Sequence, residues 1–334
     1  MQPSALPTTR WKPVLALFFV TLAWGGTFVW MKETQDHTRL VMGEGAQLSG
    51  TAYFMGLRFA LAALLLGLWG KARFRLGDRS VWAGGFWLGI LLWLGFVLQM
   101  LGLTEVSPAV SAFLTSLYVL FTAILSLCLA RRRPGLGLIV GVLCATVGAG
   151  VIRGRPELHF TLGELQTLAC ALVFAGHILV TDRVTKRVPP LPATLASFVW
   201  VAALSFATFA IAGLFEGPQP AERWLELALA PQYLSPLLLS TGLATVLALS
   251  LMNLFQRELD PVRAAILYAL EPIWAAAFGI WGGHDAFTPW LVGGGVILLA
   301  GNLIAELGGR KQTQWYWPRS LCTPTLHIGT RVSC

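Results

Sequence analysis

The chain has 334 residues, of which 56% are hydrophobic and only 12% are charged, and its formal net charge is +8. Soluble domains carry about 25% charged residues, so this composition excludes an ordinary soluble protein and indicates an integral membrane protein. The basic excess does not indicate nucleic-acid binding, because no basic face with interleaved aromatic residues occurs outside short segments between apolar runs.

Ten long apolar runs follow one another along the chain. Each has about 18 to 23 residues, long enough for a helix to cross a hydrocarbon core of about 30 Å. Because the runs do not alternate between apolar and polar residues, as the strands of a membrane barrel would, we expect an all-α bundle. The expected helices span residues 14–32, 50–70, 82–103, 108–130, 135–152, 162–182, 192–214, 234–256, 262–282 and 287–306.

The segments between these runs are short, apart from the expected loops at residues 33–49 and 216–233. The first run is too long for the apolar core of a signal peptide and has no small-residue cleavage site, so we expect it to be retained as a helix. The five Cys show no metal-binding spacing, and three of them lie in apolar runs. We therefore expect no metal and no cofactor. No ATP site is expected either, because the chain lacks a phosphate-binding loop.

Lys and Arg side chains gather on one side of the expected bundle. With the N-terminus placed inside, the segments on that side hold 18 of the 24 basic residues, and the opposite side holds 5. Cytoplasmic loops carry such an excess, so we expect both termini in the cytoplasm. The chain would be a multi-pass protein of the plasma membrane, which in a bacterium is the inner membrane.

An internal repeat organises the chain. Residues 101–150 laid over residues 254–303 without a gap, a shift of 153, give ten identities in 50 positions. The identical pairs are Leu101/Leu254, Glu105/Glu258, Pro108/Pro261, Ala112/Ala265, Leu114/Leu267, Leu117/Leu270, Ala123/Ala276, Leu138/Leu291, Gly141/Gly294 and Gly148/Gly301. A weaker match pairs Trp24-Gly25-Gly26 with Phe174-Ala175-Gly176.

The repeat predicts two five-helix units, residues 1–153 and 160–306, followed by a mobile cytoplasmic tail at 307–334. Because five is odd, the second unit enters the membrane from the side opposite the first, so the two units are inverted. Inverted repeats are a common plan of secondary transporters. Duplication as a simple way to build a large bundle remains an alternative.

Glu271 is the clearest ionisable residue deep inside an expected helix, about 13 Å from either end. A charge at the bilayer centre costs roughly 3 kcal/mol or more, so this carboxyl needs a partner, a cavity or water. Desolvation favours its neutral form and a cation its charged form, which would let it exchange a proton for a solute. Alternatively, it pairs with Arg58 as a structural tether, or it caps broken backbone.

Pro272 follows this glutamate directly. It removes its own amide donor and disrupts the bond to the carbonyl of Tyr268, so we expect a kink that serves either a binding site or packing. At the shift of 153 the counterpart of Glu271 is Tyr118 and that of Pro272 is Val119. Symmetry therefore predicts that Tyr118 and Glu271 lie near each other across a pseudo-two-fold axis.

Arg58 lies about 12 Å deep in the second expected helix. Its planar guanidinium suits either a carboxylate solute or a structural pairing with Glu271. His177 takes the place of Thr27 in the weaker match and is either a packing residue or a proton relay. Gln99, Asn253 and Ser250 are polar groups that either line a cavity or join helices. The aromatic residues Trp24, Trp93, Tyr268 and Trp274 either stack on an organic solute or pack in the bundle.

Four segments of the sequence resemble the ten-helix EamA-type exporters of the drug/metabolite transporter superfamily. They are LAWGGTFVWMK from residue 22, LRFALAALLL from residue 57, SPAVSAFLTSLYVLFTAILS from residue 107 and DPVRAAILYALEPIWAAAFGIW from residue 260. The resemblance covers residues 14–306 and includes the repeat. It implies a proton-linked or facilitative carrier with a central cavity lined by helices 1–4 and 6–9, with helices 5 and 10 behind. The expected loop at 33–49 and the tail depart from the family, as does the absence of an acidic residue directly before helix 10, where Asp285 is nearest.

We therefore expect a secondary active transporter that exports small metabolites, amino acids or drugs, with proton coupling left open, as a monomer or a homodimer. The alternatives are a facilitative carrier or channel without proton coupling, and an intramembrane enzyme. The sequence has no HExxH, no GxSxG and no paired intramembrane aspartates, so we do not expect an enzyme.

Overall fold

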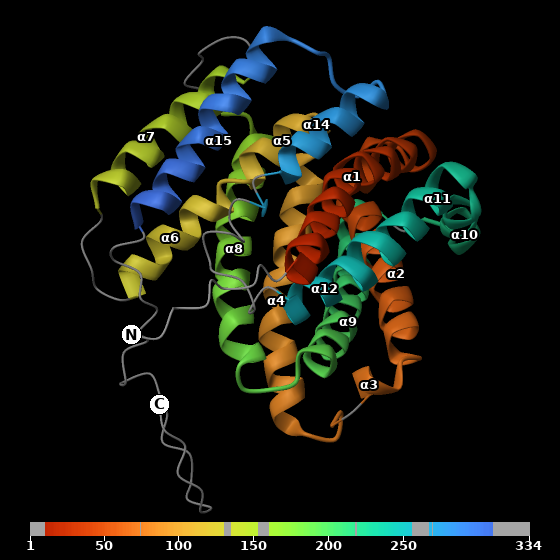
Figure 1. Cartoon of the computed structure of the whole chain (residues 1–334). Coiled ribbons are helices and arrows are strands. Elements are labelled where there is room, and N and C mark those ends of the chain that lie inside the picture. Colours follow the sequence, from red (N-terminus) through yellow and green to blue (C-terminus); the bar gives the residue numbers. More distant parts are fainter. Residues whose placement is uncertain are drawn as a thin grey trace, which may run out of the picture.

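The computed structural model describes residues 11–73, 75–129, 135–152, 160–217, 219–255, 267–268 and 270–309. Helix is the regular structure throughout these ranges, with no strand (Figure 1). The elements are α1 (Trp11–Met42), η1 (Glu44–Ala46), α2 (Gln47–Gly67), α3 (Gly70–Arg73), α4 (Arg79–Gly102), α5 (Pro108–Thr115), α6 (Tyr118–Leu129), α7 (Leu136–Val151), α8 (Leu162–Thr185), α9 (Pro190–Glu216), α10 (Ala221–Leu229), α11 (Pro231–Leu239), η2 (Ser240–Leu247), α12 (Ala248–Phe255), α14 (Glu271–Trp281) and α15 (Pro289–Gly309).

The expectation of an all-helical membrane protein is confirmed. Within the described ranges, seven helical segments are long and apolar enough to cross a membrane, and 136–151 and 289–305 are shorter apolar helices. The ninth expected helix, 262–282, lies partly outside the described residues. The expected tail lies outside the described residues as well, apart from residues 307–309, which complete α15. The count of ten spanning helices therefore remains a prediction.

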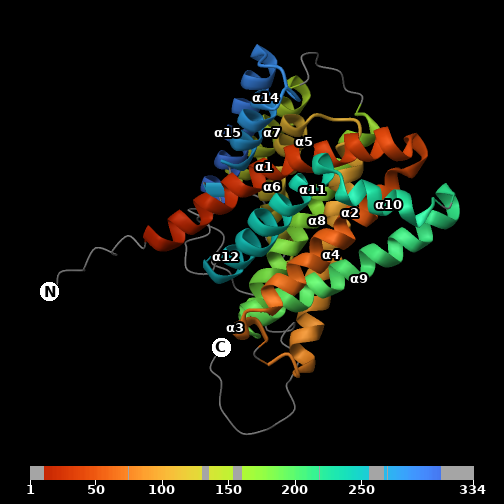
Figure 2. The ribbon, with the colours of Figure 1, turned by 90° about the vertical axis from the view of Figure 1, so that its right-hand side faces the viewer.

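The prediction of a loop at residues 33–49 was wrong. Helix α1 continues to Met42, η1 follows, and α2 begins at Gln47. Figure 2 shows α1 as one long helix that runs from one side of the bundle to the other. The polar residues beyond the apolar run stay helical because some of them are buried and bonded to neighbouring helices, as Gln35 is to Thr51 and to the carbonyl of Met100. The expected loop at 216–233 likewise contains α10, which buries Trp224 and Leu227.

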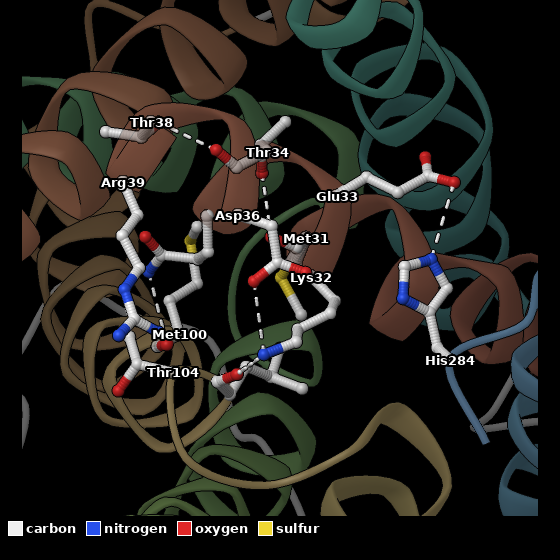
Figure 3. Close-up of polar contacts among 12 residues, drawn as sticks. Met31, Lys32, Glu33, Thr34, Asp36, Thr38, Arg39, Met100, Thr104 and His284 are labelled. Atoms are coloured by element: carbon white, nitrogen blue, oxygen red, sulfur yellow. Dashed lines mark hydrogen bonds and ion pairs between the residues drawn. The ribbon is translucent and has the colours of Figure 1, made fainter. Parts of the chain in front are cut away.

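Polar contacts fix the end of α1 that follows the apolar run (Figure 3). The Lys32 ammonium donates to the carbonyl of Leu103 at 2.9 Å and pairs with Asp36 at 3.2 Å. Glu33 lies 3.8 Å from the imidazole of His284, in the segment between α14 and α15. The end of α1 is therefore attached both to the end of α4 and to the α14–α15 connection.

Three carboxylates at helix connections accept hydrogen bonds from the first turns of other helices. Asp285 accepts from the amide of Ala109 in α5 at 3.0 Å, Glu105 from that of Gly163 in α8 at 2.8 Å, and Glu216 from that of Ser49 in α2 at 2.8 Å. Negative charge is favourable at helix N-termini. Burial raises the pKa of the Asp285 carboxyl above its ordinary value, and the hydrogen bonds to that carboxyl oppose this effect. These contacts join segments far apart in the sequence.

Helices α7 and α15 lie side by side and pack through glycines (Figure 1). A methyl group added to Gly141 would overlap Ala305 and the carbonyl of Gly301, and one added to Gly148 would overlap Leu298 and the carbonyl of Gly294. Small residues permit such close approach between membrane helices.

The contacts between these two helices are reciprocal under the shift of 153. Gly141 faces Gly301 and Gly148 faces Gly294, while the repeat equates Gly141 with Gly294 and Gly148 with Gly301. Gly141 thus contacts the equivalent of Gly148, and Gly148 contacts the equivalent of Gly141. A two-fold axis produces this pattern.

We predict that Gly148→Leu lowers the free energy of unfolding by about 1–3 kcal/mol, the usual effect of overpacking. Gly150→Leu, two residues further along α7, is the matched control, because no atom lies within 4 Å of a methyl group added there. Denaturant unfolding of both variants in detergent tests this, and equal stability would contradict the close packing described.

Two helices are interrupted near the middle of the bundle. The expected helix 108–130 is instead α5 and α6, separated at Ser116 and Leu117. In the second half, Leu270 lies in a turn and α14 begins at Glu271. The expected kink at Pro272 coincides with this interruption, and the proline occupies the first turn of α14, where its missing amide breaks no helical bond.

Candidate functional site

A cavity lies inside the bundle. Helices α1, α4, α5, α6, α8, α12 and α14 and the described pair 267–268 contribute to its wall. The lining residues are Trp24, Thr27, Phe28, Leu92, Phe96, Gln99, Thr115, Tyr118, Phe174, His177, Ile178, Leu249, Met252, Tyr268 and Glu271. Ligand pockets in proteins are mainly apolar with a few polar groups that orient the ligand, and the lining of this cavity has that character.

The wall is built from equivalent positions of the two halves. At the shift of 153 the lining pairs are Phe96/Leu249, Gln99/Met252, Thr115/Tyr268 and Tyr118/Glu271. At the shift of 150 given by the weaker match they are Trp24/Phe174, Thr27/His177 and Phe28/Ile178. Leu92 is the one lining residue outside these seven pairs, so the cavity lies where the two halves meet.

Glu271 and Tyr118 are in direct contact, as symmetry predicted. The phenol of Tyr118 donates to Oε2 of Glu271 at 3.0 Å. Both residues are at most 7% exposed, and each begins the helix that follows an interruption. Among the described residues, no basic side chain lies within ion-pair distance of Glu271. The carboxyl is therefore buried with a neutral hydrogen-bond donor beside it.

Aromatic rings extend from this carboxyl across the wall. The ring of Tyr268 meets that of Tyr118 edge-on at 6.4 Å between centroids and stacks on the indole of Trp24 at 6.2 Å. The indole nitrogen of Trp24 donates to the carbonyl of Ala244 at 3.1 Å. Phe96 and Phe174 meet edge-on at 5.4 Å elsewhere in the wall. Such rings offer apolar faces to a flat or aliphatic solute.

The remaining polar lining residues have protein partners. The hydroxyl of Thr27 donates to the carbonyl of Ala23, and the amide of Gln99 reaches the hydroxyl of Thr115 at 3.4 Å. His177 lies 3.5 Å from the hydroxyl of Thr181, one turn further along α8. Among the described lining residues, Glu271 and His177 are the acidic or basic ones. The described residues include no group of three or more His, Cys, Asp or Glu that could hold a metal ion.

The alternative prediction that Arg58 pairs with Glu271 as a structural tether was wrong. Arg58 is fully buried, but its Nε donates to the hydroxyl of Thr245 at 2.7 Å, and its guanidinium stacks on Phe96 at 4.7 Å. In the described part of the chain no acidic group lies within ion-pair distance of it, and its Nη2 has no partner. Arg58 does not line the cavity, because Phe96 belongs to the wall and lies against it.

Four further sequence candidates lie away from the cavity. Asn253 joins α12 to α9 through a 2.6 Å bond to the hydroxyl of Thr194, which is the helix-joining role that the sequence left open. Ser250, Trp93 and Trp274 are also absent from the wall. Trp274 packs instead against Gly25 of α1 and meets Phe18 edge-on.

Sequence reasoning missed eight lining residues, most of them apolar. They are Phe28, Leu92, Phe96, Thr115, Phe174, Ile178, Leu249 and Met252. Apolar residues carry no sign of a cavity in an apolar sequence. The two shifts would have found three of them, since they map the sequence candidates Gln99, Tyr268 and Trp24 onto Met252, Thr115 and Phe174.

Comparisons with known proteins agree with this architecture. The model of the "EamA-like transporter family" matches residues 11–154 and again residues 161–306. A relative described as "Uncharacterized transporter", from Archaeoglobus fulgidus, is 27% identical over 295 residues, which are 88% of this chain and 85% of that protein. A solved structure described as "Crystal structure of protein" superposes with a TM-score of 0.58 at 19% identity, covering 91% of this chain and 100% of the other. At that identity the likeness concerns the fold alone.

Proposed function

Because the chain belongs to the EamA-like transporter family, and so is a multi-pass membrane transporter, we propose that it exports small organic solutes in exchange for protons. The solute binds in the cavity, and Glu271 is the group that solute and proton share. Ten helices form two inverted five-helix units, residues 1–153 and 160–306, with both termini in the cytoplasm.

The observation that carries this proposal is the buried carboxyl of Glu271 in the wall of an otherwise largely apolar cavity. A buried ionised carboxylate without a cationic partner is strongly unfavourable. Either a proton or a positively charged group of the solute removes that cost. Because the two neutralise the same oxygens, binding of one releases the other, which is the elementary event of exchange.

The reciprocal contacts support alternating access between inverted units. The α7–α15 contacts and the cavity pairs follow from a two-fold relation between the halves. Inverted halves give outward-open and inward-open states of similar energy around a midplane site. At the pair Tyr118/Glu271 the second half has a carboxyl where the first half has a phenol, so duplication of a scaffold does not account for the charge.

The wall also indicates the kind of solute. Trp24, Tyr268 and Phe174 provide ring faces, and Glu271 provides one anionic acceptor. A compound with an apolar or aromatic body and one basic or hydrogen-bond-donating group fits this surface, which includes amino acids, metabolites and drugs of that shape.

Counterflow in proteoliposomes tests the function. We predict that vesicles preloaded with one member of a panel of amino acids, nucleosides and cationic drugs accumulate its labelled form, and that an inward proton gradient increases efflux of the same compound. Accumulation of the labelled compound at the same rate with and without the proton gradient would indicate a facilitative carrier. Failure of every compound, with folded protein present, would contradict transport through this cavity.

A further inference from the structure

The spanning segment 231–255 contains a wide helical turn that its counterpart lacks. Residues Ser240–Leu247 form a π-helix between α11 and α12. The equivalent residues 87–94 in the first half belong to α4, which is regular α-helix. The same span is therefore built without a wide turn in one half, so spanning the bilayer does not explain it. Such turns are frequently found at functional sites.

The wide turn makes one carbonyl available to a side chain. In a regular α-helix the amide of Ala248 would donate to the carbonyl of Ala244, four residues back. Here that amide reaches the carbonyls of Leu243 and Thr245 instead. The carbonyl of Ala244 accepts from the indole nitrogen of Trp24 at 3.1 Å. The turn thus provides the acceptor that orients a ring of the cavity wall.

A buried arginine holds the same turn. The hydroxyl of Thr245 donates to the carbonyl of Ser240, five residues back, at 2.8 Å, and accepts from Nε of Arg58 at 2.7 Å. The counterpart of Thr245 is Leu92, which lines the cavity, whereas Thr245 does not. The rest of the guanidinium is fixed by the sulfur of Met31 and by the rings of Phe59 and Phe96.

We propose that Arg58 and Thr245 are positioning residues of the cavity: together they stabilise the wide turn that presents the carbonyl of Ala244 to Trp24, and so fix the indole ring against Tyr268 in the wall. Arg58 then acts on the solute through Trp24 rather than by touching it. The effect on solute affinity rests on the proposed function, whereas the effect on Trp24 does not.

The test is the indole N–H signal of Trp24 in a ¹H–¹⁵N spectrum of the full chain labelled at tryptophan. The chain has 14 Trp, and loss of one signal in Trp24→Phe assigns it. In Thr245→Val, which neither accepts from Arg58 nor donates to Ser240, we expect that signal to shift as its hydrogen bond weakens. Arg58→Lys keeps the charge but lacks Nε–H and should shift it likewise. Thr245→Ser keeps the hydroxyl and should restore it.

Thr241→Val is the matched control, because Thr241 lies in the same turn and its hydroxyl donates to the carbonyl of Leu237, on its own helical segment, rather than contacting Arg58. An unchanged Trp24 signal in folded Thr245→Val or Arg58→Lys overturns the proposal, whatever happens to transport. For a solute found by counterflow, Thr245→Val should raise KM about tenfold with little change in kcat. This is the loss of binding free energy expected when about one hydrogen bond is removed. A shifted signal with an unchanged KM would overturn the role in solute binding.

Discussion

Replacement of Glu271 by glutamine is expected to reduce proton-driven solute transport to the level of protein-free vesicles, while the protein still folds. The amide keeps the size of the side chain and can still accept a hydrogen bond from Tyr118. It binds no proton, however, and carries no charge for a cationic group. Flux in proteoliposomes under an inward proton gradient, together with thermal unfolding in detergent, checks both parts.

Two variants sharpen this result. Glu226→Gln changes an exposed glutamate on α10 and should leave flux unchanged. Tyr118→Phe removes the phenol hydroxyl but keeps the carboxyl, so it should retain coupling while changing the affinity for the solute. Full coupling in Glu271→Gln would remove Glu271 from the mechanism.

Exchange of the two buried charges, in Arg58→Glu with Glu271→Arg, is expected to give little folded protein. Arg58 lies among Phe59, Phe96 and Met31 and donates to Thr245. A carboxylate there would lose the cation–π contacts and the donated hydrogen bond. Leaving a charge uncompensated in a protein interior costs about 3–5 kcal/mol. Expression and unfolding in detergent measure the effect.

The double variant separates this arrangement from a permanent ion pair. If the two charges were partners, the exchange would restore the stability lost in Arg58→Glu alone. We expect no restoration, because each residue has its own set of neighbours and no ion pair joins them. Recovery of folded protein in the double variant would show that Arg58 and Glu271 pair in some state of the transporter.

Much of the fold could be predicted because the membrane imposes simple rules. Apolar runs of spanning length give helices, and the shift of 153 gives the duplication. The contact between Tyr118 and Glu271 followed from that shift, because equivalent residues meet only near the axis that relates the halves. The charge at residue 271 stood out because ionisable residues are rare in apolar helices.

Other features depend on packing that no local pattern reveals. The pairing of Arg58 with Glu271 was a reasonable expectation for two buried opposite charges, but the rings of Phe59 and Phe96 and the hydroxyl of Thr245 hold the guanidinium instead. The wide turn at 240–247 leaves no sign in an apolar run. The helical continuation of α1 to Met42 was missed because polar residues such as Gln35 were assigned to a loop.

Proton release on solute binding tests the shared carboxyl most directly. Purified protein in weakly buffered detergent would be mixed with the solute found by counterflow, at a pH where the empty carboxyl is protonated, and free protons would be followed with an indicator dye. If solute and proton compete for Glu271, the wild type releases up to about one proton per bound solute, and Glu271→Gln releases none. Solute binding by the wild type without proton release, or equal release by Glu271→Gln, would contradict exchange at this residue.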